Sequence, residues 1–124
     1  MSDPAPTVYL VDDDVSVLRG LGRLLAAAGM KVAAFDSPRE FLGRLDPAAP
    51  GCLILDVAMP GMSGPDLERE LRLRRREIPI VFITACADET VRPRLLAQGA
   101  VECLFKPFSD TALLGAVNAA LRKS

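Results

Sequence analysis

Five polar side chains that could carry out chemistry follow short apolar runs of this chain. They are Asp12 and Asp13 after the first run, Asp56 after the third, Thr84 after the fourth and Lys106 after the fifth. Carboxylates that share a pocket repel one another, which raises their pKa values unless a cation lies between them. Oxygen ligands suit a hard ion, and Mg²⁺ is the natural candidate because it keeps waters that a phosphate can replace.

These residue types are suited to phosphoryl transfer. Asp56 can act as a nucleophile, because carboxylates form aspartyl phosphates. Lys106 offers a positive charge to a phosphoryl oxygen, and Thr84 offers a hydroxyl donor. A metal, a lysine and a hydroxyl would together stabilise the charge on the transferring oxygens. The simpler alternative is that these residues merely end their strands.

The remaining sequence predicts the elements that position these residues. Apolar runs at 8–11, 31–35, 52–55, 80–83 and 101–105 predict strands. Apolar residues at helical spacing predict helices over 14–28, 38–45, 64–76, 88–98 and 109–122. Five strands that alternate with five helices indicate a single-domain, doubly wound α/β fold with a parallel sheet covered on both faces. Ligands of such folds bind outside the carboxyl ends of the strands, so the five polar residues are expected on one rim.

Local signals set several helix boundaries. Ser37 and Glu40 have the spacing of a capping box at the start of the second helix. Gly29 and Gly99 are good terminators of the first and fourth helices. Pro93 lies inside the fourth helical stretch and lacks an N–H group, which predicts a short helix that starts near residues 90–92.

Composition excludes several classes of function. The 124 residues fit one domain, and Lys plus Arg (15) almost balances Asp plus Glu (16), which makes direct nucleic-acid binding unfavourable. The absence of His excludes histidine triads and histidine–metal sites. Residues 1–6 resemble a flexible arm rather than a signal peptide, and no apolar stretch is long enough for a membrane span. The odd number of cysteines favours reduced thiols and a cytoplasmic location; they are Cys52, Cys86 and Cys103.

The motifs, taken in order, resemble the receiver domain of two-component response regulators. This is the CheY-like, flavodoxin-like fold, and receivers of the FixJ/NarL type are especially similar. The matching segments are 10–14, 55–56, 59–64, 84–85, 99–100 and 106–108. The resemblance runs from about residue 8 to 121, and it implies a sheet order of 2-1-3-4-5 and a receiver domain over residues 7–123.

The resemblance also implies a role for each residue at the rim. Asp56 would be the phosphoacceptor for a sensor histidine kinase, and Thr84 and Lys106 would bind the phosphoryl group. The Mg²⁺ ligands would be Asp12, Asp13, Asp56 and the backbone carbonyl of Ala58. The Lys106–Pro107 peptide would be cis, a form that X–Pro bonds tolerate. The next acid, Asp14, is expected to be a helix N-cap.

One position departs from the family pattern. A Tyr or Phe usually lies three residues before the lysine and moves with the threonine, whereas this chain has Cys103. Phe105 lies on the same strand face and is either an exposed anchor or a packing residue. The fourth helix, fifth strand and fifth helix would form the surface that responds to Thr84. That surface would control a downstream protein or an attached output domain, or would form a homodimer.

Three other functions are compatible with parts of the sequence. A haloacid-dehalogenase-type phosphatase would use the acids of 12–15, but its later acidic pair is missing, because only Asp110 follows Lys106. An FMN carrier would need a phosphate-binding loop after the first strand, where three Asp would repel the phosphate. A receiver-like binding module that ignores phosphorylation is the third, because Cys103 replaces the aromatic residue. The favoured interpretation is a switch that catalyses only its own phosphorylation and dephosphorylation.

Overall fold

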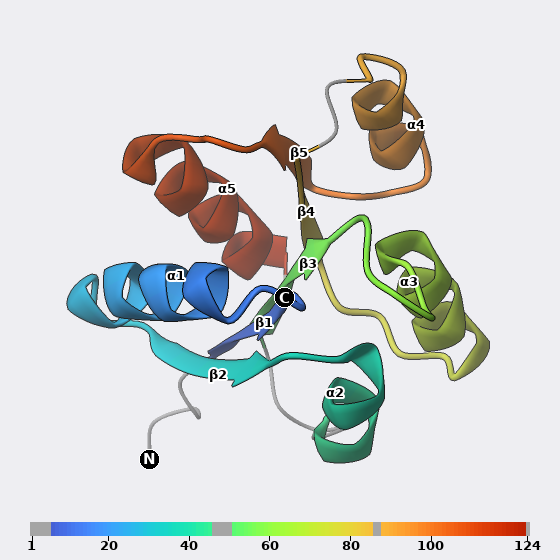
Figure 1. The fold of residues 1–124 in the computed structure, drawn as a ribbon, viewed down its shortest axis with the longest axis horizontal. Helices are drawn as coiled ribbons and strands as arrows, with labels where there is room; N and C mark the ends of the chain where they lie inside the picture. The colour runs from blue at the N-terminus through green and yellow to red at the C-terminus, as the bar shows by residue number, and fades with distance from the viewer. Residues whose placement is uncertain (1–5, 46–50, 86–87, 124) are drawn as a thin grey trace.

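A five-stranded parallel sheet forms the centre of the molecule (Figure 1). The computed structural model describes residues 6–45, 51–85 and 88–123. The strands are β1 (Thr7–Val11), β2 (Lys31–Phe35), β3 (Gly51–Asp56), β4 (Ile80–Thr84) and β5 (Glu102–Phe105). Their order is β2-β1-β3-β4-β5, and each neighbouring pair is parallel. The predicted α/β class and strand order are therefore confirmed.

Helices cover both faces of this sheet. They are α1 (Val15–Ala27), α2 (Pro38–Arg44), α3 (Gly64–Leu73), α4 (Val91–Ala97) and α5 (Asp110–Lys123). Figure 1 shows α1 and α5 on one face and α2, α3 and α4 on the other. Each face has its own apolar cluster, with Leu25 and Leu113 in one and Phe41 and Leu71 in the other. All residues of β1, β3 and β4 are buried, which explains why these strands are apolar without alternation.

Helix starts follow the capping signals closely. The Asp14 carboxylate accepts the N–H groups of two residues in the first turn of α1, at 2.9 and 3.4 Å, and so forms the expected cap. The Ser37 hydroxyl accepts the Glu40 N–H at 3.2 Å, which is one half of the predicted capping box. A complete capping box occurs at α3, where Ser63 and Asp66 exchange both bonds. This second box was not predicted from the sequence.

The predicted end of the third helix at residue 76 is wrong, because α3 ends at Leu73. Arg75 has a φ of 55°, and the N–H groups of Arg75 and Arg76 bond back to carbonyls of the last turn at 3.0 and 2.8 Å. Gly29 and Gly99 have the same left-handed backbone after α1 and α4. Glycine adopts this conformation without strain, whereas arginine does not. Because good helix formers continue past Leu73, the sequence contains no local signal for the end of α3.

The fourth helix is short and starts late, as Pro93 predicted. It begins at Val91, which places Pro93 in the first turn, where its missing N–H needs no acceptor. Before it, the Asp88 carboxylate accepts the N–H and the hydroxyl of Thr90 at 2.9 and 2.7 Å. These bonds hold the segment that leads into α4 in a turn instead of a helix.

Candidate functional site

Three carboxylates meet at the carboxyl edge of the sheet. Asp12 follows β1 directly and Asp56 is the last residue of β3, and β1 and β3 are neighbours in the sheet. Oxygen atoms of Asp12, Asp13 and Asp56 lie within 4.8 Å of one another. Asp12 is 1% exposed and Asp56 is 6% exposed, whereas Asp13 is open to solvent. The topology therefore brings together acids that are far apart in the sequence.

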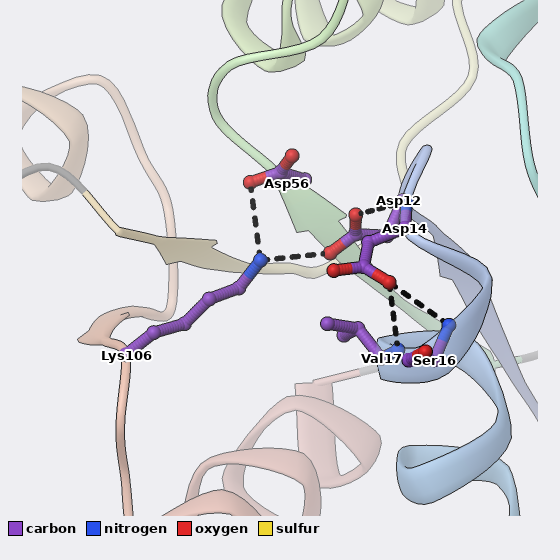
Figure 2. A network of polar contacts seen from close by, with 6 residues as sticks. All are labelled: Asp12, Asp14, Ser16, Val17, Asp56 and Lys106. Atoms are coloured by element: carbon purple, nitrogen blue, oxygen red, sulfur yellow. Dashed lines mark hydrogen bonds and ion pairs between the residues drawn. The ribbon is translucent and has the colours of Figure 1, made fainter.

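Lys106 lies between two of these carboxylates (Figure 2). Its Nζ is 3.0 Å from Asp12 Oδ2 and 3.7 Å from Asp56 Oδ1. The other Asp12 oxygen accepts the Asp14 N–H at 2.9 Å, so the start of α1 also fixes the Asp12 side chain. A buried charge needs both a counter-charge and hydrogen bonds, and Asp12 has both.

The environment of Asp56 perturbs its carboxyl. Its pKa is raised from 3.8 to about 6: burial is the largest cause and the charges of Asp12 and Asp13 act in the same direction, whereas Lys106 and a backbone hydrogen bond from Ala58 act in the opposite direction. A carboxyl with a pKa near 6 is mostly ionised at pH 7 and is therefore able to act as a nucleophile.

The donor set fits a hard divalent cation. Three carboxylates face one ammonium group, so negative charge remains uncompensated within the site. All the donors are oxygen atoms, which suits Mg²⁺ better than a soft metal. Ala58, the fourth expected ligand, is exposed in the loop that follows β3. The site therefore has the chemistry of a magnesium site at the edge of the sheet.

Thr84 and Lys106 end neighbouring strands. Thr84 is fully buried at the end of β4, and its carbonyl accepts the Lys106 N–H at 2.8 Å. The Lys106–Pro107 peptide bond is cis. The structure thus groups Asp12, Asp56 and Lys106 by direct contact and places Thr84 at the end of the adjoining strand.

The two candidate switch residues differ in burial. Cys103 is 1% exposed and belongs to the apolar cluster beneath α2, α3 and α4, and burial raises the pKa of its thiol. Phe105 is half-buried and belongs to neither apolar cluster, so it matches neither of its two expected roles completely. Cys86 lies outside the described residues.

Glu102 has a structural role that was not predicted from the sequence. Its Oε1 accepts a hydrogen bond from Arg92 Nε at 2.9 Å and lies 2.8 Å from Arg92 Nη2. The same oxygen accepts the Cys103 N–H at 2.9 Å. This contact joins the first turn of α4 to the free edge of β5. No local pattern signals it, because the two charged residues lie on different elements.

Gly64 sets the path of the loop that follows Asp56. Its N–H donates to the Val57 carbonyl at 2.9 Å, and an added Cβ would overlap the Asp56 carbonyl oxygen and lie 3.1 Å from the Phe82 ring. We expect Gly64→Ala to lower the free energy of unfolding by about 2 kcal/mol, because a tightly packed backbone must shift. Urea denaturation measures this change.

Gly20→Ala is the matched control for that substitution. Gly20 lies within α1, and nothing is within 4 Å of an added Cβ. Alanine is a better helix former than glycine, so the free energy of unfolding of this variant should rise by about 0.5–1 kcal/mol. If both variants lost the same free energy of unfolding, the close backbone contact at Gly64 would not be the cause of the loss.

Comparison with known proteins defines the class of the molecule. The family described as response regulator receiver domain matches residues 8–118, and the chain belongs to this family. It is a signalling domain of two-component systems and not a conventional enzyme, which removes the phosphatase and flavin-carrier alternatives. None of the described helices has the length and apolar character needed to cross a bilayer.

Curated relatives match nearly the whole of this chain. It is 43% identical to the response regulator protein TodT of Pseudomonas putida over 122 residues, which are 98% of this chain and 54% of TodT. It is 44% identical to nodulation protein W of Bradyrhizobium diazoefficiens over 116 residues, which are 94% of this chain and 51% of that protein. The chain therefore spans about half the length of these curated relatives.

Solved structures give the same assignment. The response regulator StyR superposes with a TM-score of 0.91 at 47% identity, over 97% of this chain and 61% of StyR. The structure named FixJ-N superposes with a TM-score of 0.89 at 33% identity, over 100% of this chain and 98% of that one.

Proposed function

We propose that this domain is a phosphorylation-dependent switch in which Asp56 is the phosphoacceptor. The observation that carries the proposal is the geometry of Asp56: a buried carboxylate at the carboxyl edge of the sheet, 3.7 Å from Lys106 and beside two further acids. A sensor histidine kinase is the donor. An Asp56 oxygen bonds to phosphorus, the P–N bond of the phosphohistidine breaks, and the electron pair stays on the imidazole nitrogen.

Mg²⁺ is the proposed cofactor. The ligands are Asp12, Asp13, Asp56 and the backbone carbonyl of Ala58. When bound, the ion supplies positive charge that offsets the negative charge of the incoming phosphoryl group. The acids themselves are already held in place, since the Asp14 N–H and the Lys106 ammonium fix Asp12.

Lys106 and Thr84 bind the transferred group. The Lys106 ammonium leaves its carboxylate partners for a phosphoryl oxygen, where it stabilises charge during transfer. The Thr84 hydroxyl donates to another phosphoryl oxygen. Hydrolysis by water later breaks the acyl–phosphate bond, which releases inorganic phosphate and restores the Asp56 carboxylate.

The output surface is formed by α4, β5 and α5. Phosphorylation changes the balance between two states of this surface, and a partner reads the difference. The partner is a downstream protein, an attached output domain or a second copy that pairs through the same surface as a homodimer. Residues 7–123 make up this receiver domain, which acts in the cytoplasm and does not itself bind nucleic acid.

A second candidate function is a binding module that does not depend on phosphorylation. It is favoured by Cys103, which is fully buried and has no ring to move between core and surface. The complete set of acids, together with Lys106, supports the switch instead.

Intact-mass spectrometry tests the proposal directly. Wild type and Asp56→Asn are incubated with acetyl phosphate, with and without Mg²⁺. We expect one phosphoryl adduct on wild type that requires Mg²⁺ and is absent from the variant. Wild type without an adduct under these conditions would contradict the proposal and favour the binding module.

A further inference from the structure

A cavity of about 610 Å³ lies between α3 and α4, at the edge of the sheet where the strands begin. Gly51 and Ile80, which line it, are the first residues of β3 and β4, and Val101 directly precedes β5. Asp56 lies at the other end of β3, at the edge where the strands finish. The cavity is therefore separate from the carboxylate site, and it needs an explanation of its own.

The floor of the cavity is apolar and belongs to the core. Four side chains of the apolar cluster beneath α2, α3 and α4 form it, and all are buried: Leu71, Ile80, Phe82 and Leu95. Ile78 and Ala100 also line the cavity and pack against the same cluster. Protein interiors are normally closely packed, so a hollow of this size against the core is unusual. Its volume lies within the range of about 300–1,000 Å³ that is typical of small-molecule sites with apolar linings.

The ends of α3 and α4 flank this cavity on the same face of the sheet (Figure 1). A helix end leaves carbonyl oxygens without partners inside the helix, and these would repel an anion. Here the Arg76 N–H donates to the Leu71 carbonyl at 2.8 Å, and the Ala100 N–H donates to the Leu95 carbonyl at 3.1 Å. Both carbonyls are thus hydrogen-bonded already, and the side chains at the rim set the local charge.

The rim of the cavity carries more positive than negative charge. The charged side chains among its described lining residues are Glu68, Arg72, Arg76, Glu77 and Lys123. Arg72 and Glu68 form an ion pair at 2.9 Å, so their charges compensate each other. Two cations, Arg76 and Lys123, then remain with one acid, Glu77. An anionic group would complement this excess of positive charge, and an arginine fork suits the paired oxygens of a carboxylate or sulfonate.

From the shape, floor and rim of this cavity, we propose that it binds a small organic anion with an apolar body, of the class of aromatic carboxylates and sulfonates. The apolar body lies against Leu71, Phe82 and Leu95, where its contact with water is removed. The anionic group lies at the rim and binds the Arg76 guanidinium. This proposal is independent of the phosphorylation of Asp56, because it uses none of the residues at the carboxyl edge.

The dye 1-anilinonaphthalene-8-sulfonate is an anion of this class and tests the proposal on the protein itself. Its fluorescence, followed during titration, should show one saturable site with a Kd on the order of 10–100 µM, the range expected for a ligand of this size. Ala100→Leu places a larger side chain in the cavity and should raise the Kd about tenfold. Arg76→Gln removes a rim charge and should raise it about fivefold.

Lys31→Gln is the matched control for the loss of charge. Lys31 is exposed on β2, which is separated from β4 by β1 and β3, so this variant should bind the dye as wild type does. Circular dichroism and urea denaturation of each variant show whether it is folded. If Ala100→Leu does not fold, amide chemical shifts of wild type replace it, and the dye should move the signals of Gly99, Ala100 and Val101 most.

Several outcomes would overturn the proposal. Dye binding that does not saturate, or an equal Kd for wild type and Ala100→Leu, would place the dye elsewhere. Amide shifts confined to other parts of the chain would have the same meaning. An unchanged Kd for Arg76→Gln would show that the cavity does not select an anion. A dimer of wild type that Ala100→Leu converts to a monomer would make a second copy of the chain the occupant.

Discussion

Lys106→Met should slow the phosphorylation of Asp56 by acetyl phosphate roughly 100-fold, the usual cost of removing one preorganised charge from a transferring group. The Lys106 ammonium is 3.7 Å from Asp56 Oδ1 and the Lys106 side chain is only 23% exposed, so solvent replaces this charge poorly. Methionine has a similar length but no charge. The rate of adduct formation, followed by intact mass at saturating Mg²⁺, measures the effect.

Two further variants define what the loss at Lys106 means. Lys31→Met removes an exposed charge from β2 and should leave the rate unchanged. Lys106→Arg keeps a positive charge in the site and should be phosphorylated at an intermediate rate. This variant also serves as the test if Lys106→Met folds poorly because Asp12 has lost its ion-pair partner. A rate for Lys106→Met close to that of wild type would show that Lys106 does not stabilise the transfer.

Asp56→Asn should change how the stability of the metal-free protein depends on pH. The pKa of Asp56 is about 6 in the folded protein, against 3.8 for an ordinary aspartate. The folded state therefore binds this proton more tightly than the unfolded state does. This tighter proton binding contributes about 3 kcal/mol to the free energy of unfolding. The contribution is complete below pH 4 and is lost as the pH rises through 6.

Denaturant unfolding from pH 4 to pH 7.5 without Mg²⁺ checks this expectation. Asp56→Asn should gain stability relative to wild type across that range, because asparagine has no charge to bury. Asp66→Asn is the control: hydrogen bonds from Ser63 lower the pKa of the Asp66 carboxyl from 3.8, so its contribution is almost complete at pH 4 and the difference from wild type should stay nearly constant over this range. A pH-independent difference between wild type and Asp56→Asn would mean that the Asp56 carboxyl is not perturbed.

The sequence by itself determined the architecture and the place of the site. Apolar runs that end in Asp12, Asp56, Thr84 and Lys106 could be recognised because buried parallel strands are apolar throughout. Their carboxyl ends must meet at one edge, so the polar residues that follow them had to gather there. Asp14 as an N-cap and Pro93 in a first turn could be predicted for similar reasons, since both depend on neighbours only a few residues away.

The tertiary structure alone decided how these residues interact. Lys106 and Asp12 are 94 residues apart, and only the folded sheet sets their distance of 3.0 Å. The pKa of Asp56 depends on burial and on charges from other strands, which no local pattern contains. Cys103 is buried whereas Phe105, two residues later on the same strand, is half-buried, and no local pattern predicts this difference. Local preferences act over one turn or one strand, whereas distances, burial and charge coupling arise from packing between elements that are distant in the sequence.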